Sequence, residues 1–399
     1  MDFQYSNKVK GMRPSIIREL LKQMSDPSLI SFAGGNPAAD SFPIEEIRAI
    51  SDRLLNSDPV GLLQYSVTEG YGPLLAACRR FANRQWPVVS ERDAVMITSG
   101  SQQIIEFVTK LLCNEGDVVA VEEPAFLGAY NSMRSFGAQL RGVPLQPDGV
   151  DLERLEAAFA QKPTPKFFYC IPNFQNPTGY TTSAEKRRAI YRLAVQYGVP
   201  VLEDDPYGAL RIEGEPLAPI KGYDTCGAVI YAGSFSKILS PGMRLAFCAA
   251  QPDLIGKMVT AKQGSDVHTN IWAQRVCCEL LTTTDMDAHL ARLQGIYREK
   301  ALYMMRQLDA QLGGKVRYVR PQGGMFIWAQ LPDGADADVF AQNCLRRKLA
   351  VVPGSAFYTD SGVRRPFVRL NFSTPTKQQI DQGAAIMAEV LAECTNTQQ

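Results

Sequence analysis

The chain has 399 residues, 45% of them hydrophobic, which is enough for one large domain and a smaller one. Its 42 basic and 41 acidic side chains leave a net charge of +1, so composition indicates neither a nucleic-acid partner nor an anionic membrane. The N-terminus lacks the apolar core of a signal peptide, and no apolar run approaches the roughly 20 residues of a membrane helix. We therefore expect a cytoplasmic protein.

The cysteines and histidines form no pattern typical of a metal site. The nine cysteines include no C-x-x-C pair, and the two histidines, His268 and His289, are well separated in sequence. We expect free thiols in a reducing compartment and no bound metal.

Short apolar segments alternate with helical patterns through the first three quarters of the chain. Segment 14–25 predicts a short amphipathic helix opened by a proline. Strands are predicted at 94–100, 117–122, 139–145, 167–172, 199–204, 228–234 and 244–250, and helices between them as at 101–113 and 183–197. Because several strands are apolar throughout, they favour an α/β fold: a seven-stranded, mostly parallel sheet between helices.

The pattern changes after about residue 252. A long helical region at 253–313 precedes short strands and a terminal helix, predicted at 316–320, 324–331, 367–372 and 376–394. This change indicates a small α+β domain. We predict an N-terminal arm and helix at 1–40 that packs with the small domain, a large domain at 41–295 and the small domain at 296–399.

The most informative segment runs from Gly233 to Gly242 and is followed by Met243 and Arg244. Here Lys237 stands among hydroxyl side chains, with an arginine seven positions later. This arrangement can hold a phosphate beside an amine, which suits a lysine that forms a Schiff base with pyridoxal phosphate. Taken alone, Lys237 is equally consistent with a surface lysine.

Further polar groups follow the predicted strands, where ligands bind in open α/β sheets. The small residues around Ser101 predict an anion site at a helix start, or an ordinary N-cap. The turn at 173–179 contains an amide, Asn176, that could donate to a ligand oxygen. The carboxylates of 203–205 are costly to bury unless they are paired, and either a pyridinium N–H or a metal would pair them. No phosphate-loop or dinucleotide fingerprint is present.

Together these motifs resemble the fold type I pyridoxal-phosphate-dependent aminotransferases of class I/II, and within them the 2-aminoadipate/kynurenine subgroup. The resemblance covers nearly the whole chain. It rests on SFAGGNP at 31–37, LQYSVTEGYG at 63–72, TSGSQQ at 98–103, QNPTG at 175–179, EDDPY at 203–207, GSFSK at 233–237, RPQGGMF at 320–326 and VRLNFS at 368–373. Several ordered motifs are far more specific than any one of them.

The resemblance implies how the cofactor ring is held. Lys237 would carry the covalent link and then move a proton. Asp204 would pair with the pyridinium nitrogen, while Tyr207 and Asn176 would hydrogen-bond the ring oxygen. Phe126 would stack on the ring, at a position where tyrosine is common.

The resemblance also implies a phosphate site and a dimer. The phosphate residues would be Ser101, Gln102, Ser234, Ser236 and Arg244. Tyr65 would reach the phosphate of the neighbouring subunit, which requires a homodimer with a shared active site.

For the substrate, the resemblance implies that Arg369 clamps the α-carboxylate, with Asn176 beside it; the alternative is a surface arginine at a strand edge. Gly35 and Arg18 would line the side-chain pocket. Arg18 would bind the distal carboxylate of 2-oxoglutarate or 2-aminoadipate and swing away for apolar side chains, although a solvated helix arginine fits its position nearly as well.

The implied function is transfer of the amino group of an L-amino acid to a 2-oxo acid, with 2-oxoglutarate as the expected acceptor, by a ping-pong mechanism. Another reaction of the same cofactor on this fold, as in a β-lyase, decarboxylase or racemase, stays open. A regulatory module attached to a DNA-binding domain is disfavoured, because the sequence opens on the arm and first helix.

Overall fold

The computed structural model describes residues 3–10, 28–360, 362 and 365–396. The predicted helix at 14–25, with Arg18, lies outside the described residues. A short helix α1 (Asn7–Lys10) precedes that segment.

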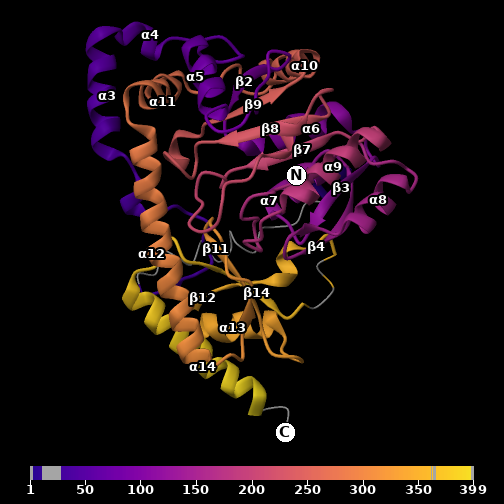
Figure 1. Ribbon diagram of the computed structural model, residues 1–399, viewed down its shortest axis with the longest axis vertical. Helices are drawn as coiled ribbons and strands as arrows, with labels where there is room; N and C mark the ends of the chain where they lie inside the picture. The colour runs from indigo at the N-terminus through magenta and orange to yellow at the C-terminus, as the bar shows by residue number, and fades with distance from the viewer. Residues whose placement is uncertain (1–2, 11–27, 361, 363–364, 397–399) are drawn as a thin grey trace.

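The larger part of the molecule is built around an eight-stranded sheet of order β2-β9-β8-β7-β6-β3-β4-β5 (Figure 1). Its strands are β2 (Ala94–Thr98), β3 (Val118–Glu123), β4 (Gln139–Gln146), β5 (Gly149–Val150), β6 (Phe168–Cys170), β7 (Val201–Asp205), β8 (Val229–Ser234) and β9 (Ala246–Ala250). From β8 through β4 all neighbours are parallel, whereas β9 is antiparallel to both β2 and β8.

All the strands predicted in this region are confirmed, and the two-residue β5 is an addition at the edge. The predicted burial on both faces is also confirmed, because successive side chains enter different apolar clusters. On β6, for example, Phe168 packs in one cluster and Tyr169 in the other; on β7, Val201 and Leu202 divide in the same way. The sheet therefore lies between two apolar layers.

Helices pack against this sheet and against one another. They are α3 (Ile44–Ser57), α4 (Pro59–Leu63), α5 (Gly72–Ala82), α6 (Ser101–Leu112), α7 (Leu127–Arg134), α8 (Leu152–Ala160), α9 (Ala184–Tyr197), α10 (Pro252–Gln263) and α11 (Ile271–Thr283). The predicted helical region at 253–313 consists of α10, α11 and the long α12 (Met286–Leu312). Asn270 and Asp285 cap the starts of α11 and α12 by accepting backbone N–H bonds, which explains these breaks.

The smaller part has a four-stranded antiparallel sheet of order β10-β11-β14-β13. Its elements are β10 (Arg317–Tyr318), β11 (Phe326–Gln330), α13 (Ala337–Arg346), β12 (Leu349–Ala350), β13 (Val352–Pro353), β14 (Phe367–Asn371) and α14 (Lys377–Asn396). Short 3-10 turns lie at η2 (Ala39–Ser41), η3 (Ile220–Tyr223), η4 (Pro241–Met243) and η5 (Gly354–Phe357).

The N-terminal strand β1 (Ile30–Ser31) pairs with β12 in this smaller part. Helix α12 runs along the molecule from α11 to the region of α14 (Figure 1). The domain boundaries at 40/41 and 295/296 stay a prediction.

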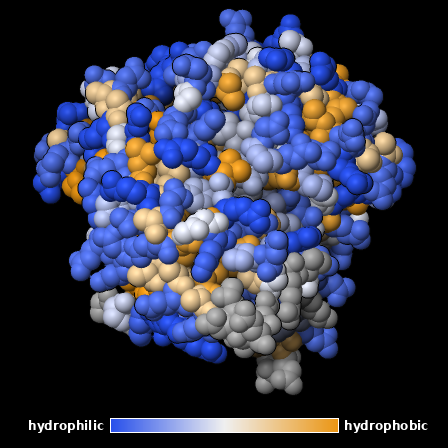
Figure 2. All heavy atoms as spheres, turned by 60° about the horizontal axis from the view of Figure 1, so that its bottom comes forward, coloured by the Kyte–Doolittle hydropathy of each residue, from blue (hydrophilic) through white to orange (hydrophobic). Residues whose placement is uncertain are grey.

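The face of the molecule in Figure 2 is mainly hydrophilic, with hydrophobic residues in separate groups. Across the described ranges, no helix has the length and apolar character needed to span a bilayer.

Two glycines test how the smaller part is packed. A Cβ on Gly383 of α14 would lie 2.3 Å from the Phe32 ring, whereas a Cβ on Gly295 of α12 would meet open space. Gly383→Ala is therefore expected to destabilise the protein by about 1–3 kcal/mol, the usual range for overpacking. Gly295→Ala is expected to stabilise it by up to about 1 kcal/mol through helix propensity.

Denaturant midpoints of both variants, compared with the wild type in the same cofactor-free preparation, check this pair. Equal midpoints for the two variants would contradict the packing of Phe32 against α14.

Candidate active site

One cavity of about 250 Å³ gathers the predicted site residues of the described chain, with the exception of Tyr65. Its lining comprises Gly35, Ser101, Gln102, Phe126, Asn176, Asp204, Tyr207, Ser234, Ser236, Lys237, Arg244 and Arg369, together with Ile171, Pro206, Pro241 and Phe326. These residues come from strand ends, from the start of α6 and from β11 and β14 of the smaller part. The cavity is therefore the candidate active site.

The three carboxylates at the end of β7 have different surroundings. Because side chains alternate along a strand, Glu203 and Asp205 point away from the side that Asp204 faces. Glu203 is fully buried and accepts the backbone N–H groups of Ile220 and Lys221 at 2.9 and 2.7 Å. Its hydrogen-bonding capacity is used within the protein.

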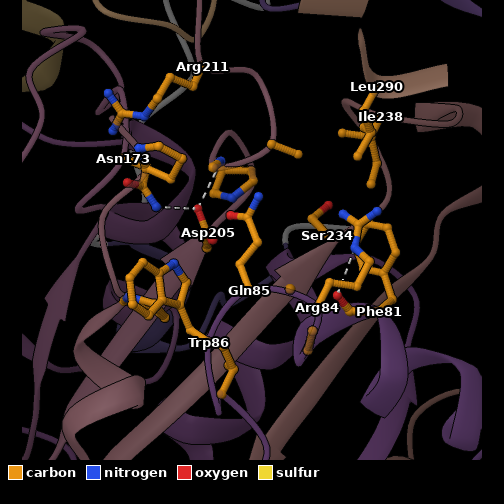
Figure 3. Close-up of a pocket in the computed structure, with 18 of the residues that line it drawn as sticks. Phe81, Arg84, Gln85, Trp86, Asn173, Asp205, Arg211, Ser234, Ile238 and Leu290 are labelled. Atoms are coloured by element: carbon orange, nitrogen blue, oxygen red, sulfur yellow. Dashed lines mark hydrogen bonds between the residues drawn. The ribbon is translucent and has the colours of Figure 1, made fainter. Parts of the chain in front are cut away.

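Asp205 is also fully partnered. It accepts from the Asn173 amide at 3.0 Å, from the Gly208 N–H at 2.9 Å and from the Tyr231 hydroxyl at 2.8 Å. It lines a neighbouring cavity, which shares Pro206 and Ser234 with the first; Figure 3 draws its bond from Asn173. This carboxylate therefore braces the loops behind the candidate site.

Asp204 differs from both. It is 2% exposed, and its Oδ2 accepts the Tyr169 hydroxyl at 2.9 Å. Its Oδ1 is buried and has no hydrogen-bond partner among the described residues. Burial raises the pKa of Asp204 to about 7, although the bond from Tyr169 acts in the opposite direction. A buried carboxylate of this kind needs a further hydrogen-bond donor, and a protonated nitrogen of a ligand could supply it.

Lys237 supplies the amine of the site. Its Nζ donates to the Gly35 carbonyl at 2.6 Å. Burial, followed by the nearby charges of Arg369 and Arg244, lowers the pKa of Lys237 to about 8. This amine is therefore neutral far more often near physiological pH than an ordinary lysine, and the neutral form is the nucleophile.

The start of α6 and Arg244 form a site for an anion. No side chain caps this helix, so its first N–H groups remain available. A Cβ at Gly100, the residue before the helix, would lie 2.3 Å from Nη2 of Arg244, so only glycine lets the guanidinium approach this closely. The hydroxyl residues Ser234 and Ser236 line the same cavity. This set of donors can hold a phosphate.

Arg369 lies on β14, is 2% exposed and lines the cavity. Its Nη1 donates to Asn176 Oδ1 at 2.8 Å and its Nη2 to the Ala33 carbonyl at 2.6 Å. Its Cζ lies 4.3 Å from the centre of the Phe326 ring. Burial lowers the pKa of Arg369 to about 10. Arg369 is therefore a cation of the pocket wall, and the alternative of a surface arginine is wrong.

Two aromatic residues in or behind the cavity lining, Phe326 and Tyr169, were not singled out from the sequence. Phe326 belongs to the RPQGGMF motif, and its ring contacts both Arg369 and Tyr207. Tyr169 lies in the middle of the apolar strand β6 and carried no signal beyond its hydroxyl. Its position against Asp204 depends on strand pairing, in which Tyr169 lies opposite Leu202.

Tyr65 lies outside the cavity and is 83% exposed, with its ring edge-on to His268 at 5.7 Å. Other apolar side chains are exposed on the same helix–loop region and on α11, which packs against α4. They are Val60, Leu63, Val67 and Trp272. We call these residues and Tyr65 the Tyr65 surface. A group of exposed apolar side chains of this kind is typical of an interaction face.

Within the described ranges, no group of three or more His, Cys, Asp or Glu side chains is placed to hold a metal ion. The eight cysteines whose side chains the structure describes are free thiols. The metal alternative for the carboxylates at 203–205 thus receives no support from neighbouring ligands.

Comparison with known proteins identifies the family. The family model described as aminotransferase class I and II matches residues 27–386. The chain therefore belongs to this family, and it is a pyridoxal-phosphate-dependent aminotransferase of fold type I.

Its similarity to individual proteins extends over nearly the whole chain. It is 39% identical to a 2-aminoadipate transaminase of Thermus thermophilus, over 95% of this chain and 94% of the relative. It is 35% identical to aromatic-amino-acid aminotransferase 1 of Thermococcus litoralis, over 98% and 94%. A solved α-aminoadipate aminotransferase of Thermus thermophilus, complexed with N-(5'-phosphopyridoxyl)-L-leucine, matches with a TM-score of 0.89 and 37% identity, covering 98% of both chains.

The residues present fit this cofactor. The unpartnered Oδ1 of Asp204 can accept a hydrogen bond from a protonated ring nitrogen. Because Gly100 has no Cβ, the Arg244 guanidinium can lie close to the uncapped start of α6. A phosphate bound there would meet both the guanidinium and the free backbone N–H groups. Lys237, with its lowered pKa, lines the same cavity and can react with an aldehyde.

The raised pKa of Asp204 makes the stability of the cofactor-free protein depend on pH. Because its pKa of about 7 exceeds the ordinary carboxyl value, the folded protein binds this proton more tightly than the unfolded chain does. The stabilisation is present at low pH and is lost as the pH rises towards 7. Glu122 and Glu203, whose pKa values burial also raises to about 7, act in the same direction.

Asp204→Asn removes one of these titrations. At pH 8 the cofactor-free variant is expected to be more stable than the wild type by about 1 kcal/mol or more, because no charge is buried there. At pH 5 the difference should be smaller. Urea unfolding at the two pH values measures it, and an equal difference at both would show that Asp204 does not titrate abnormally.

Proposed function

We propose that this aminotransferase moves the amino group of an L-amino acid, either 2-aminoadipate or one with an aromatic or aliphatic side chain, to a 2-oxo acid. The acceptor is 2-oxoglutarate, and donor and acceptor react in turn in a ping-pong cycle. The observation that carries the proposal is the meeting of Lys237, Asp204 and Arg369 in one cavity. The names of the relatives, which include 2-aminoadipate and aromatic amino acids, support the donor class.

Pyridoxal phosphate, when bound, supplies an aldehyde that links to amines and a ring that draws electrons away from the Cα of the amino acid. Lys237 provides the amine for the covalent link. Once released from that link, the Lys237 Nζ would take the proton from Cα of the amino acid and deliver it to the carbon that had been the aldehyde of the cofactor. The lowered pKa of Lys237 suits this task, because the base must be neutral near neutral pH.

The remaining cavity residues hold the cofactor in place. Asp204 pairs with the ring nitrogen and keeps it protonated. Tyr207, 4% exposed, and Asn176 hydrogen-bond the ring oxygen, while Phe126 packs on the ring face. The phosphate is bound by Ser101, Gln102, Ser234, Ser236 and Arg244.

Arg369 binds the α-carboxylate of amino and oxo acids. Its Nε is buried and has no hydrogen-bond partner among the described residues, so the guanidinium keeps donor capacity for a ligand. Asn176, whose Oδ1 accepts from Arg369 at 2.8 Å, orients the guanidinium. Excess positive charge beside Lys237 also favours an anionic substrate.

Arg18 and the loop around Gly35 select the side chain. Gly35 lines the cavity, and a Cβ there would lie 3.6 Å from the Phe326 ring. Arg18 pairs with the distal carboxylate of 2-oxoglutarate or 2-aminoadipate and leaves the pocket for apolar side chains. The solved relative with a leucine adduct supports acceptance of an aliphatic donor.

The enzyme is a cytoplasmic homodimer in this proposal. The Tyr65 surface, with Val60 at 72% and Tyr65 at 83% exposure, supplies an apolar contact face. Tyr65 then reaches the phosphate in the partner subunit.

The donor panel tests the function. Protein carrying the cofactor is mixed, without acceptor, with 2-aminoadipate, glutamate, leucine, phenylalanine or kynurenine. We expect the visible absorbance of the lysine-linked cofactor to disappear, with about one 2-oxo acid formed per site in a single turnover. Lys237→Ala, the control, should lack that absorbance at the start.

Products other than 2-oxo acids would contradict transamination. An amine with carbon dioxide, the D-amino acid, or ammonia with an eliminated side chain would point to a decarboxylase, a racemase or a β-lyase. Retention of the absorbance in Lys237→Ala would show that another residue carries the cofactor.

Two arginine variants test substrate recognition. Arg369→Gln should raise KM for every amino and oxo acid by roughly one to two orders of magnitude, because each loses the same charged hydrogen bonds. Arg18→Gln should raise KM for 2-oxoglutarate and 2-aminoadipate by roughly tenfold and leave phenylalanine nearly unchanged. Steady-state kinetics with both substrate types separates the two patterns, and an equal effect of Arg18→Gln on phenylalanine would remove its selective role.

A further inference from the structure

Tyr169 is the residue behind the cofactor site that the proposed function leaves without a role. It lies at the centre of β6, is completely buried, and belongs to the apolar cluster on the same side of the sheet as Leu202. Its hydroxyl is aimed at the end of the next strand, where it donates to Asp204 Oδ2 at 2.9 Å. A phenylalanine would fill the apolar layer equally well, so packing does not explain the hydroxyl.

The bond divides the two oxygens of Asp204 between the protein and the cavity. Oδ2 is bound to Tyr169, and Oδ1 is left without a partner among the described residues. Because χ2 of an aspartate is a broad torsion, an unrestrained carboxylate could rotate and offer either oxygen. The hydroxyl holds one oxygen and thereby sets the direction of the other.

The same bond bears on the charge of Asp204. A hydrogen bond donated to a carboxylate favours its ionised form, and such bonds are stronger than neutral ones in a buried site. Burial raises the pKa of Asp204 to about 7, and the Tyr169 bond is the largest influence that lowers it. The Ser101 side chain acts in the same direction as Tyr169, whereas the negative charge of Asp205 opposes ionisation; Tyr207 also faces this carboxylate.

We propose that Tyr169 is a positioning residue for the cofactor: its hydroxyl orients Asp204 and stabilises its charged form, so that Oδ1 meets a protonated ring nitrogen. This inference rests on the proposed function, in which Asp204 pairs with that nitrogen. Tyr169 does not touch the cofactor in this arrangement and acts only through Asp204.

Tyr169→Phe removes the hydroxyl and keeps the ring. We expect the dissociation constant for pyridoxal phosphate, measured by titrating cofactor-free protein, to rise roughly tenfold, as for loss of a hydrogen bond to a charged group. In the holoenzyme loaded with ¹⁵N-labelled cofactor, the solid-state NMR signal of the ring nitrogen should move towards its unprotonated position. A wild-type signal and a wild-type dissociation constant would overturn the proposal.

Tyr303→Phe is the matched control. Tyr303 of α12 also donates to a carboxylate, that of Asp381 on α14, at 2.9 Å, but neither residue lines the candidate active site. This variant should leave both the dissociation constant and the nitrogen signal unchanged. An equal effect of both variants would reduce the role of Tyr169 to general stability.

A double-mutant cycle with Asp204→Asn separates this inference from the proposed function. If Asp204→Asn alone does not weaken cofactor binding, the pairing of Asp204 with the ring nitrogen is wrong, and the proposed site fails first. If it does weaken binding, adding Tyr169→Phe should have little further effect, because both residues act on the same bond. Full additivity of the two changes would show that Tyr169 acts by another route.

Discussion

The burial of Asp204 is the constraint on which the rest of the site depends. A carboxylate inside an apolar sheet is unfavourable unless it is paired, and here the protein pairs only one of its two oxygens. Glu203 and Asp205, its neighbours on β7, are fully partnered by backbone and side-chain donors. The site is thus built with one acceptor reserved for a ligand that carries a proton on a ring nitrogen.

The positive side of the cavity complements that acceptor. Lys237, Arg244 and Arg369 line one cavity, and their mutual repulsion together with burial lowers the pKa of the lysine to about 8. Two of these cations suit anions: Arg244 lies beside the start of α6, and Arg369 lies on β14. The fold therefore brings a carboxylate acceptor, an amine and two further cations into one cavity, where they could hold pyridoxal phosphate and an anionic substrate.

The sequence predicted much of this arrangement for a physical reason. Buried parallel strands read as apolar runs, and polar residues that follow such runs must lie at one edge of the sheet, as Asp204, Asn176 and Ser101 do. Tyr169 could not be predicted, because its partner is set by the register of β6 against β7. The family resemblance singled out Asp204 among the three carboxylates at 203–205, but the physical difference between them lies in hydrogen bonds that only the folded chain forms.

The most direct test of the account is a crystal structure of the protein with pyridoxal phosphate bound, refined well enough to place the ring. The account predicts that the ring nitrogen lies within hydrogen-bonding distance of Asp204 Oδ1 while Tyr169 still donates to Oδ2, and that Lys237 is covalently linked to the cofactor. A ring whose nitrogen faces another group, or an Asp204 that remains unpaired, would contradict it.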